Sequence, residues 1–559
     1  PHDGVIWADV SAEVISELCA GVDMVRRDEQ AHHTASSVAQ AKAVLCDRGH
    51  GAYTPLAPAE RMDELADLSA VDGTDIVVVG GGFAGLATAC CLAKAGADVT
   101  LLEKNEQVGG RASRLEREGF TFDMGPSWYL MPDVFERFFG HLGYDPAELY
   151  ELERLDPHYR IFFKDGDQVD MVPDLEANKA VFESYEAGAG EALQRYLAES
   201  KQTYEIGMEH FVYTDRPRLR DYMDWDVIRH SWGLPLVRKM QGHVEKYFDH
   251  PKLQQIMQYT LVFLGGAPTN TPALYNLMSH VDFNMGVYYP THGLGGVVDA
   301  MVTVADDLGV QIVTDAPVAS ITGERGAFTV HTEADTHAAE VVVSGADYRH
   351  TEMELLAPED RQYDASYWDG RVYAPSAYLL YLGVEGDVDA LAHHTLVLPT
   401  AWDEHFEEIF EAPAWPNDPA YYLCVPSKTD PDVAPEGHSN LFALVPIAPG
   451  LEDTPQLRAA YRDKLLADVA ENTGVDLRDR IVVEESFCVE DFVDRYNATE
   501  GTALGLAHTL RQTALLRPGH RSSALDGLYF TGAFTTPGIG VPMCLISGQL
   551  TAEAVAADG

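Results

Sequence analysis

The residues with the clearest chemical meaning are three glycines spaced G-x-G-x-x-G and an acid that follows them. Gly80, Gly82 and Gly85 come directly after a β-branched run, and Glu103 ends a second apolar run. In this pattern the first glycine allows a tight turn, the second lets a pyrophosphate approach the backbone, and the third lets a helix pack closely on a strand. The carboxylate can accept hydrogen bonds from the hydroxyls of a ribose. These four residues therefore predict a dinucleotide-binding site.

The hydrophobic pattern around these residues predicts the elements that position them. Residues 76–79 are typical of a strand buried on both faces, and residues 99–102 repeat that pattern. Between the two runs, apolar residues at helical spacing predict a helix whose N-terminus offers N–H groups to phosphates. A lone G-x-G-x-x-G is weak evidence, but the full order of strand, glycines, helix, strand and acid favours a nucleotide site over a structural turn. The acid alone does not separate NAD from FAD.

The residues after the second strand narrow the choice of cofactor. Gly109, Gly110 and Arg111 follow it directly, and this glycine pair with an arginine resembles the FAD-binding signature of the amine-oxidase and phytoene-desaturase superfamily. In that superfamily the arginine reaches the pyrophosphate as a fixed-charge donor. The resemblance therefore implies FAD as the cofactor, with Lys104, Gly110 and Arg111 in its site.

A second stretch resembles the same family. Residues 119–129 predict a strand and a turn, and within them Phe122 to Pro126 are similar to the F-D-x-G-P stretch of phytoene desaturases, which lies beside the isoalloxazine. The resemblance implies that Met124, Gly125 and Pro126 belong to the flavin site and that the backbone at Val318 contacts the adenine. From the residues alone this stretch would be an ordinary strand and turn.

The C-terminal part of the chain carries the remaining motifs. Residues 528–531 predict a buried strand that ends in a glycine-rich loop containing Gly532. Gly540 and Val541 start a last helix, whose N-terminus can face the flavin carbonyls or a phosphate. Over residues 75–557 the chain thus resembles a phytoene-desaturase-type carotenoid desaturase. The resemblance implies that Gly532, Gly540 and Val541 also belong to the FAD site.

One departure from that family pattern concerns a possible catalytic residue. Thr535 and Thr536 precede Pro537, where many relatives have a histidine before the proline. The departure puts in doubt any catalytic role at this place.

The order of elements predicts an α/β fold with discontinuous domains. A Rossmann-like FAD-binding domain with a parallel sheet takes residues 75–130, 290–350 and 515–557. It is interleaved with a substrate or cap domain of antiparallel sheet plus helices, residues 131–289 and 351–514. Residues 1–70 show no hydrophobic period, so we expect an N-terminal extension that is disordered, or the artefact of a misplaced start, and assign it no function.

The charge balance limits the environment and the partners of the protein. The chain has 39 basic and 88 acidic residues, a net charge of −49, spread along its length. Such a surface suits the salt-rich cytoplasm of a haloarchaeon, where counterions screen the repulsion. A partner with a basic surface is the alternative, whereas nucleic-acid binding is disfavoured by the sign of the charge.

The sequence gives no sign of a membrane-spanning segment. It has no run of eighteen apolar residues and no signal peptide, so we expect a cytoplasmic protein. Apolar runs at residues 234–240 and 253–264 could present a face to a bilayer surface or pack in the core. Because a carotene resides in lipid, we expect peripheral contact at the inner face of the cell membrane.

The family resemblance implies removal of hydrogen pairs from a C40 polyene in carotenoid biosynthesis. A flavin accepts one hydrogen as hydride and the other leaves as a proton, with a quinone or oxygen as the final electron acceptor. The polyene itself stabilises a developing cation, so a strong protein base is unnecessary and the catalytic residues stay unknown. Asp123 and Asp491 are candidate bases, and each is better explained as a structural carboxylate.

Several other functions stay open. Within the family they are a carotenoid 3,4-desaturase of bacterioruberin-type C50 carotenoid synthesis and a flavin-dependent carotene isomerase. Outside carotenoid chemistry the alternative is an amine oxidase, and a flavin- or carotenoid-binding module without turnover is a fourth. Absorption of the product separates them, because added double bonds shift the polyene spectrum to the red.

The cysteines and histidines predict no metal site. The seven cysteines show no C-x-x-C or zinc spacing, which fits a reducing cytoplasm. The pairs His32-His33 and His393-His394 lack further ligands nearby in sequence, so we expect surface positions for them.

Overall fold

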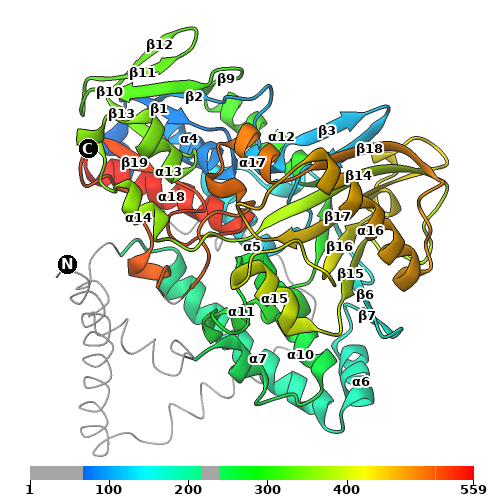
Figure 1. Ribbon diagram of the computed structural model, residues 1–559. Coiled ribbons are helices and arrows are strands. Elements are labelled where there is room, and N and C mark those ends of the chain that lie inside the picture. Colours follow the sequence, from blue (N-terminus) through cyan, green and yellow to red (C-terminus); the bar gives the residue numbers. More distant parts are fainter. Residues whose placement is uncertain (1–66, 217–237, 510) are drawn as a thin grey trace, which may run out of the picture. The chain divides into compact units, whose positions relative to one another are not determined.

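The structure, a computed structural model, describes residues 67–216, 238–509 and 511–559, which belong to one structural unit (Figure 1). The predicted N-terminal extension lies outside these ranges apart from residues 67–70, and so do His32, His33 and residues 234–237.

A five-stranded sheet carries the glycine loop. Its strand order is β19-β13-β1-β2-β9, and every neighbouring pair is parallel. Ile76 of the central strand lies opposite Val99 on one side and Val341 on the other, so segments from distant parts of the chain share one sheet. The strands are β1 (Asp75–Val79), β2 (Asp98–Leu102), β9 (Gln311–Val313), β13 (Val341–Ser344) and β19 (Leu528–Phe530).

The two faces of β1 pack in different apolar clusters. Ile76 and Val78 are buried with α4 (Phe83–Lys94), α12 (Gly293–Asp307) and α18 (Val541–Ala557). Val77 and Val79 are buried on the other face with a three-stranded antiparallel sheet. That sheet consists of β10 (Val318–Thr322), β11 (Phe328–Thr332) and β12 (Thr336–Ala339). Burial of both faces explains why the strand sequences are continuous apolar runs.

A second large sheet has seven strands in the order β18-β14-β17-β16-β15-β6-β7. All neighbours are antiparallel except β15 and β6, in which Thr395 lies opposite Arg160 in parallel register. The strands are β6 (Tyr159–Phe163), β7 (Gln168–Met171), β14 (Ser376–Glu385), β15 (His394–Leu398), β16 (Tyr421–Cys424), β17 (His438–Ile447) and β18 (Ile481–Phe487).

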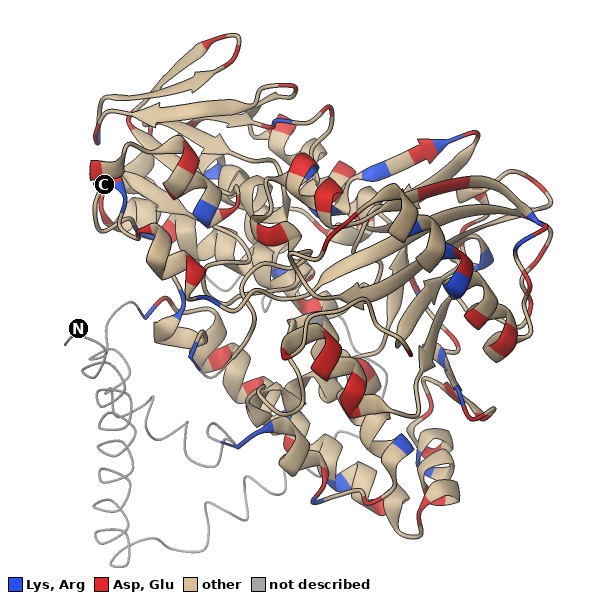
Figure 2. Ribbon diagram, viewed as in Figure 1, with Lys and Arg blue, Asp and Glu red and all other residues tan. Residues whose placement is uncertain are grey.

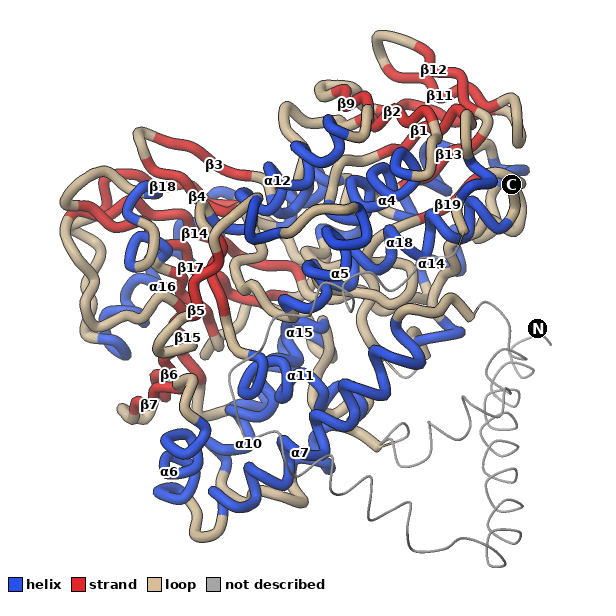
Figure 3. Tube along the Cα trace, turned by 180° about the vertical axis from the view of Figure 1, so that it is seen from behind, coloured by secondary structure: helices blue, strands red, loops and turns tan. Residues whose placement is uncertain are grey.

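Helices pack beside the second sheet, among them α15 (Trp402–Phe410) and α16 (Pro455–Thr473) (Figures 1 and 3). The apolar run of residues 253–264 packs in the core, where Leu253, Ile256 and Leu261 are buried, and none of the side chains that the structure describes in this run is an exposed large hydrophobic. The remaining helices are α5 (Pro132–Leu142), α6 (Leu175–Tyr185), α7 (Ala189–Gly207), α9 (Met240–Val244), α10 (Pro251–Gln258), α11 (Leu277–His280), α13 (Tyr348–His350), α14 (Ala365–Asp369) and α17 (Val489–Tyr496).

Two pairs of short strands lie outside the two large sheets. β3 (Arg114–Arg117) pairs with β4 (Phe120–Asp123), and β5 (Leu152–Arg154) pairs with β8 (Tyr288–Pro290), both antiparallel. The predicted fold class, a parallel Rossmann-like sheet interleaved with a largely antiparallel sheet plus helices, is confirmed. Acidic residues are spread over many elements, among them α15 and β18 (Figure 2). Of the helices in the described part of the chain, none combines the length and hydropathy needed to cross a bilayer.

Candidate functional site

The glycine loop between β1 and α4 has the geometry that its sequence predicts. Gly80 has a φ of +96°, a conformation that side chains disfavour. A Cβ at Gly85 would stand 2.0 Å from the carbonyl oxygen of Gly80, so this position admits only glycine. Gly82 is the N-cap of α4, and a Cβ there would meet nothing within 4 Å. Open space thus lies in front of the helix N-terminus, where a phosphate would accept hydrogen bonds.

Glu103 closes the other side of this loop. Its buried carboxylate accepts a hydrogen bond from the N–H of Gly81 at 2.8 Å and two from Asn105, at 2.9 Å each. The backbone of Glu103 also binds the segment that follows β9, because its carbonyl accepts from Ala316 at 2.8 Å. Val318, the first residue of β10, follows Ala316 by two residues and is therefore close along the chain to this contact with Glu103.

The Gly109–Arg111 turn lies directly against the glycine loop. Gly109 donates to the carbonyl of Gly81 at 2.7 Å, and a Cβ on Gly110 would stand 3.2 Å from Cα of Gly82. The Arg111 guanidinium lies 5.5 Å from the ring centre of Tyr496 and donates through Nη2 to the carbonyl of Thr502 at 3.3 Å. Its buried Nε has no hydrogen-bond partner within the described residues. An arginine held this way beside open space fits an anionic ligand such as a pyrophosphate.

The turn after β4 connects this site to the second sheet. Tyr381 of β14 donates from its hydroxyl to the carbonyl of Met124 at 2.6 Å, and the hydroxyls of Ser127 and Tyr422 lie 2.9 Å apart. A Cβ on Gly125 would stand 2.7 Å from the carbonyl oxygen of Arg111. The predicted flavin turn, Met124 to Pro126, therefore lies between the arginine turn and the seven-stranded sheet.

The C-terminal motifs come together with the N-terminal ones. Gly532 follows β19, and a Cβ there would stand 3.6 Å from Cβ of Ala84 in the first turn of α4. The Thr88 hydroxyl of α4 lies 3.3 Å from both the Thr531 hydroxyl and the carbonyl of Gly548. These contacts bring Gly532 close to the glycine loop, as the prediction of one cofactor spanning both chain ends requires.

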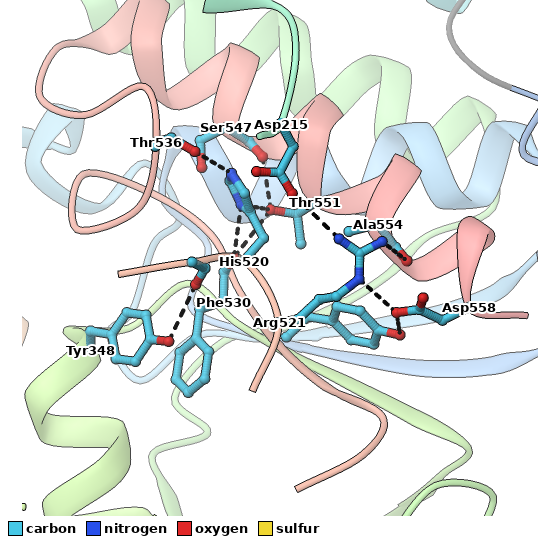
Figure 4. A network of polar contacts seen from close by, with 12 residues as sticks. Asp215, Tyr348, His520, Arg521, Phe530, Thr536, Ser547, Thr551, Ala554 and Asp558 are labelled. Carbon is cyan, nitrogen blue, oxygen red and sulfur yellow. Dashed lines mark hydrogen bonds and ion pairs between the residues drawn. The ribbon is translucent and has the colours of Figure 1, made fainter. Parts of the chain in front are cut away.

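His520 contacts the C-terminal loop between β19 and α18 (Figure 4). Its Nδ1 lies 2.9 Å from the Thr551 hydroxyl, and its Nε2 lies 2.9 Å from the Thr536 hydroxyl. Burial lowers the pKa of His520, so the ring is neutral and bridges the two hydroxyls. Beside it, Arg521 pairs with Asp215 at 3.3 Å and with Asp558 at 2.8 Å. His520 thus supports this loop through Thr536, one of the two threonines that precede Pro537.

Among the predicted site residues, the structure brings together Gly80, Gly82, Gly85, Glu103, Gly110, Arg111, Met124, Gly125 and Gly532 through the contacts described above. Gly540 is the N-cap of α18 and Val541 its first residue. Lys104 behaves differently, because its Nζ donates to the carbonyl of Asp494 at 2.7 Å and to the amide oxygen of Asn497 at 3.0 Å. It therefore holds α17 against the loop rather than pointing toward the glycines.

The two candidate bases have structural partners. Asp123 accepts hydrogen bonds from the N–H groups of Leu294 and Gly295, at 2.9 and 3.0 Å, in the first turn of α12. Its burial raises its pKa to about 6. Asp491 accepts from the N–H of Cys488 at 2.8 Å and pairs with Arg458 at 2.6 Å. Both carboxylates thus cap helices, which agrees with the structural explanation of them.

An aromatic and carboxylate cluster that the sequence does not predict lies next to the flavin turn. The hydroxyls of Tyr159 and Tyr259 donate to Oδ2 of Asp282, at 2.8 and 3.0 Å. Desolvation raises the pKa of Asp282 to about 7, and its Oδ1 has no partner in the described structure. The Trp128 ring lies 5.5 Å from that of Tyr159 and stacks on His394 at 4.3 Å. No local motif announces this cluster, because its members are scattered along the chain.

The expectation of surface positions for His393 and His394 is wrong. Their side chains are 5% and 0% exposed, and burial lowers the pKa of both rings. Each Nδ1 lies near a hydroxyl, that of Thr429 at 2.7 Å and that of Tyr422 at 2.6 Å. With Cys424 they form a buried group of metal-ligand types whose ligand atoms lie within 4.8 Å of one another. His394 is the first residue of β15, a strand whose residues are all buried, which is why the doublet packs inside.

Two family models match the chain. That of the flavin containing amine oxidoreductases matches residues 83–556, and that of the pyridine nucleotide-disulphide oxidoreductases matches residues 46–118. A carotenoid 3,4-desaturase of Haloarcula japonica is 66% identical over 496 residues, 88% of this chain and 100% of the relative. A zeta-carotene-forming phytoene desaturase of Myxococcus xanthus is 33% identical over 494 residues, 87% of this chain and 94% of the relative.

Solved structures share the fold at low sequence identity. A putrescine oxidase bound to putrescine aligns with a TM-score of 0.57 and 17% identity, covering 87% of this chain and 99% of that one. An oxidoreductase from Methanosarcina mazei aligns with a TM-score of 0.54 and 17% identity, covering 85% and 98%. The relatives and the fold together confirm the resemblance that the glycine and arginine motifs predict.

Proposed function

Because the chain belongs to the flavin containing amine oxidoreductase family, we propose that it is an FAD-dependent carotenoid desaturase. It is a flavin-dependent oxidoreductase, and its cofactor is FAD. One observation carries the proposal: the Haloarcula japonica carotenoid 3,4-desaturase is 66% identical over its full length. At that identity, with the phytoene desaturase of Myxococcus xanthus as a more distant relative, a shared substrate class is the simplest explanation.

The proposed FAD site consists of the glycine loop, Glu103, the Arg111 turn, the Met124 turn and the two C-terminal glycines. In this assignment the glycine loop and Arg111 bind the pyrophosphate, and Glu103 fixes the loop by binding the N–H of Gly81. Tyr381 and the Ser127–Tyr422 pair fix the Met124 turn against the substrate sheet. We also propose that residues 75–130, 290–350 and 515–557 form the FAD-binding domain and that residues 131–289 and 351–514 form the substrate domain.

When bound, FAD supplies the electron acceptor for breaking two C–H bonds on adjacent carbons of the polyene. The protein's own contribution is to hold the reacting bond in place and to exclude water. Trp128, Tyr159 and Tyr259 provide large apolar surfaces next to the flavin turn. Asp123 and Asp491 are engaged with helix N-termini, so we assign neither as a general base.

The position of the new double bond is the second question. The 66% identical relative has the name carotenoid 3,4-desaturase, which favours the alternative of 3,4-desaturation in C50 carotenoid synthesis over phytoene desaturation. A carotene isomerase and an amine oxidase rank below both, because neither is the named activity of these relatives.

The proposed partners follow from the substrate. We infer an apolar carotene taken from a lipid phase, a quinone or oxygen as electron acceptor, and peripheral contact with the inner face of the cell membrane in a salt-rich cytoplasm. Exposed apolar side chains support the contact, namely Val372 at 44% exposure and Leu516 at 52%. The Gln512 side chain joins their segments by bonding to both N and O of Val372, each at 2.8 Å.

The test is expression in hosts that accumulate either phytoene or lycopene and its hydrated derivatives, with pigments resolved by absorbance and mass. A red shift with loss of two mass units per step on the lycopene-type substrates, and none on phytoene, supports 3,4-desaturation. Action on phytoene assigns a phytoene desaturase instead. If every carotene is unchanged although the purified protein holds FAD in molar KCl, the proposal is wrong.

A further inference from the structure

Arg517 is a buried cation whose hydrogen-bond partners, within the described ranges of the chain, are all carbonyl groups. Its guanidinium donates to the carbonyls of Leu506 at 2.9 Å, Thr535 at 3.0 Å, Gln512 at 3.1 Å and Ala533 at 2.5 Å. The side chain is 5% exposed. Burial lowers its pKa to about 10, which leaves it charged at neutral pH.

No carboxylate in the described part of the chain compensates this charge. Tyr275, Cys544 and Tyr367 act electrostatically to raise the pKa of Arg517 against the effect of burial, and all three are neutral at physiological pH. Arg521, only four residues later, has two carboxylate partners. Burying a charge without an opposite charge beside it is unfavourable even when the group is hydrogen-bonded. In a protein with 88 acidic residues, the absence of a paired acid among those that the structure describes calls for an explanation by function.

The charge lies directly behind the loop that leads from β19 to α18. Two of its four carbonyl partners, Ala533 and Thr535, belong to this loop. A Cβ on Gly538 would stand 3.4 Å from Cζ of Arg517. Burial raises the pKa of the Cys544 thiol, in the first turn of α18, to about 11, and the positive charges of Arg111 and Arg517 oppose that rise. Positive charge from both chain ends therefore acts at this helix N-terminus, where the flavin ring is proposed to bind.

With FAD bound at this helix N-terminus, desaturation would add a negative charge there. For each double bond, two C–H bonds break and one C=C π bond forms. Two electrons and one proton pass to FAD, and the second proton leaves to solvent. The cofactor thus gains one negative charge, which the quinone or oxygen acceptor later removes with the electrons. A fixed cation nearby stabilises the reduced form relative to the oxidised form.

We propose that Arg517 supplies the counter-charge for reduced FAD and so raises the reduction potential of the bound cofactor. The inference deepens the proposed function and rests on it only for the identity of the cofactor. Arg517 is a positioning residue as well, because its four hydrogen bonds join the segment of residues 506–512 to the loop between β19 and α18.

The experiment compares wild type with R517K, R517Q and R521Q as full-length holoenzymes in molar KCl. R517K keeps the charge but has fewer donors, R517Q removes the charge, and R521Q removes a neighbouring charge that has carboxylate partners. The readouts are FAD content by absorbance and the midpoint potential of the bound FAD by equilibration with a reference dye.

We expect R517Q to weaken the binding of reduced relative to oxidised FAD about tenfold or more, which lowers the potential by about 30 mV or more for a two-electron couple. R517K and R521Q should stay near the wild-type value. Equal shifts in R517K and R517Q, or no shift in R517Q, would overturn the inference and leave Arg517 a purely structural clamp.

A second measurement covers the case in which R517Q does not fold or holds no FAD. The potential of FAD bound to the wild type should then lie above that of free FAD, and R517K should keep most of that difference. A wild-type potential at or below that of the free cofactor refutes the inference. If the wild type binds no FAD at all, it is the proposed function that fails.

Discussion

Gly82 and Gly85 of the same loop should respond to alanine in opposite ways. A Cβ at Gly82 meets nothing within 4 Å, and the residue has φ −74° and ψ 177°, which any amino acid adopts. G82A should therefore leave the apoprotein as stable as the wild type or stabilise it by about 0.4–1 kcal/mol, because alanine restricts the unfolded chain. A Cβ at Gly85 would stand 2.0 Å from a backbone oxygen, so G85A should destabilise the apoprotein by about 1–3 kcal/mol or more.

The affinity for FAD should respond to G82A even though the stability of the apoprotein does not. If the open space in front of Gly82 is where the pyrophosphate lies, a methyl group there displaces the phosphate from the N–H groups of α4. Loss of one charge-assisted hydrogen bond weakens binding by about 1.5–3 kcal/mol, or roughly tenfold to 150-fold in affinity. G82A should therefore have normal stability and poor FAD binding.

The assay is urea unfolding of the apoproteins at fixed high salt, followed by titration with FAD monitored by flavin fluorescence. Gly207, at the end of α7, is the matched control, since a Cβ there also meets nothing within 4 Å and no cofactor is proposed nearby. G207A should retain both stability and FAD affinity. Unchanged FAD affinity in G82A would refute the placement of the pyrophosphate. A destabilised G82A apoprotein would refute the claim that the space is open.

Three further changes test the loop, the helix crossing and the buried carboxylate. E103Q should lower the free energy of unfolding by about 1–3 kcal/mol and weaken FAD binding, because an amide cannot accept all three N–H hydrogen bonds. Thermal unfolding of E103Q and wild type, with and without FAD, measures both effects. Equal melting temperatures of the two proteins would refute this prediction. G548A should destabilise the protein by about 1–3 kcal/mol, because the new Cβ would stand 2.6 Å from Cβ of Ala87 where α18 crosses α4, and denaturant unfolding beside G207A measures it. Burial raises the pKa of Asp282 from 3.8 to about 7, so in this range the folded state holds a proton that the unfolded state has lost. The stabilisation present below pH 4 is therefore lost as pH rises toward 7, and D282N should gain about 2–4 kcal/mol relative to wild type over that window. A pH-independent difference between D282N and wild type would contradict the assigned shift.

The parts of the structure that the sequence predicts are those with local signals. The Rossmann-like unit could be predicted because Gly80, Gly82, Gly85 and Glu103 have fixed spacing along one strand–helix–strand segment. The participation of Gly532 in the same sheet region followed from a family resemblance, since no local pattern relates it to a strand at the other end of the chain.

What the sequence could not predict depends on contacts between distant segments. The Tyr159–Asp282–Tyr259 cluster joins residues separated by up to 123 positions, and only the folded chain brings them together. The doublet His393-His394 resembled a polar surface segment, yet it enters a buried strand where hydroxyl groups bond its rings. Lys104 followed the acid of the nucleotide motif, but the nearby end of α17 binds its ammonium group. In each case tertiary packing outweighed the local preference.

The pairing of β1 and α4 with the C-terminal elements has a consequence for synthesis on the ribosome. Thr88 contacts Thr531 and Gly548, which follow it by 443 and 460 residues. At 5–20 residues per second, the first nucleotide-binding unit emerges roughly 20–90 s before its partners. During that interval an apolar strand and a glycine loop have neither α18 nor β19 to cover them. Cofactor capture should therefore be the last event of folding, and nascent chains of this protein depend on protection from aggregation until translation ends.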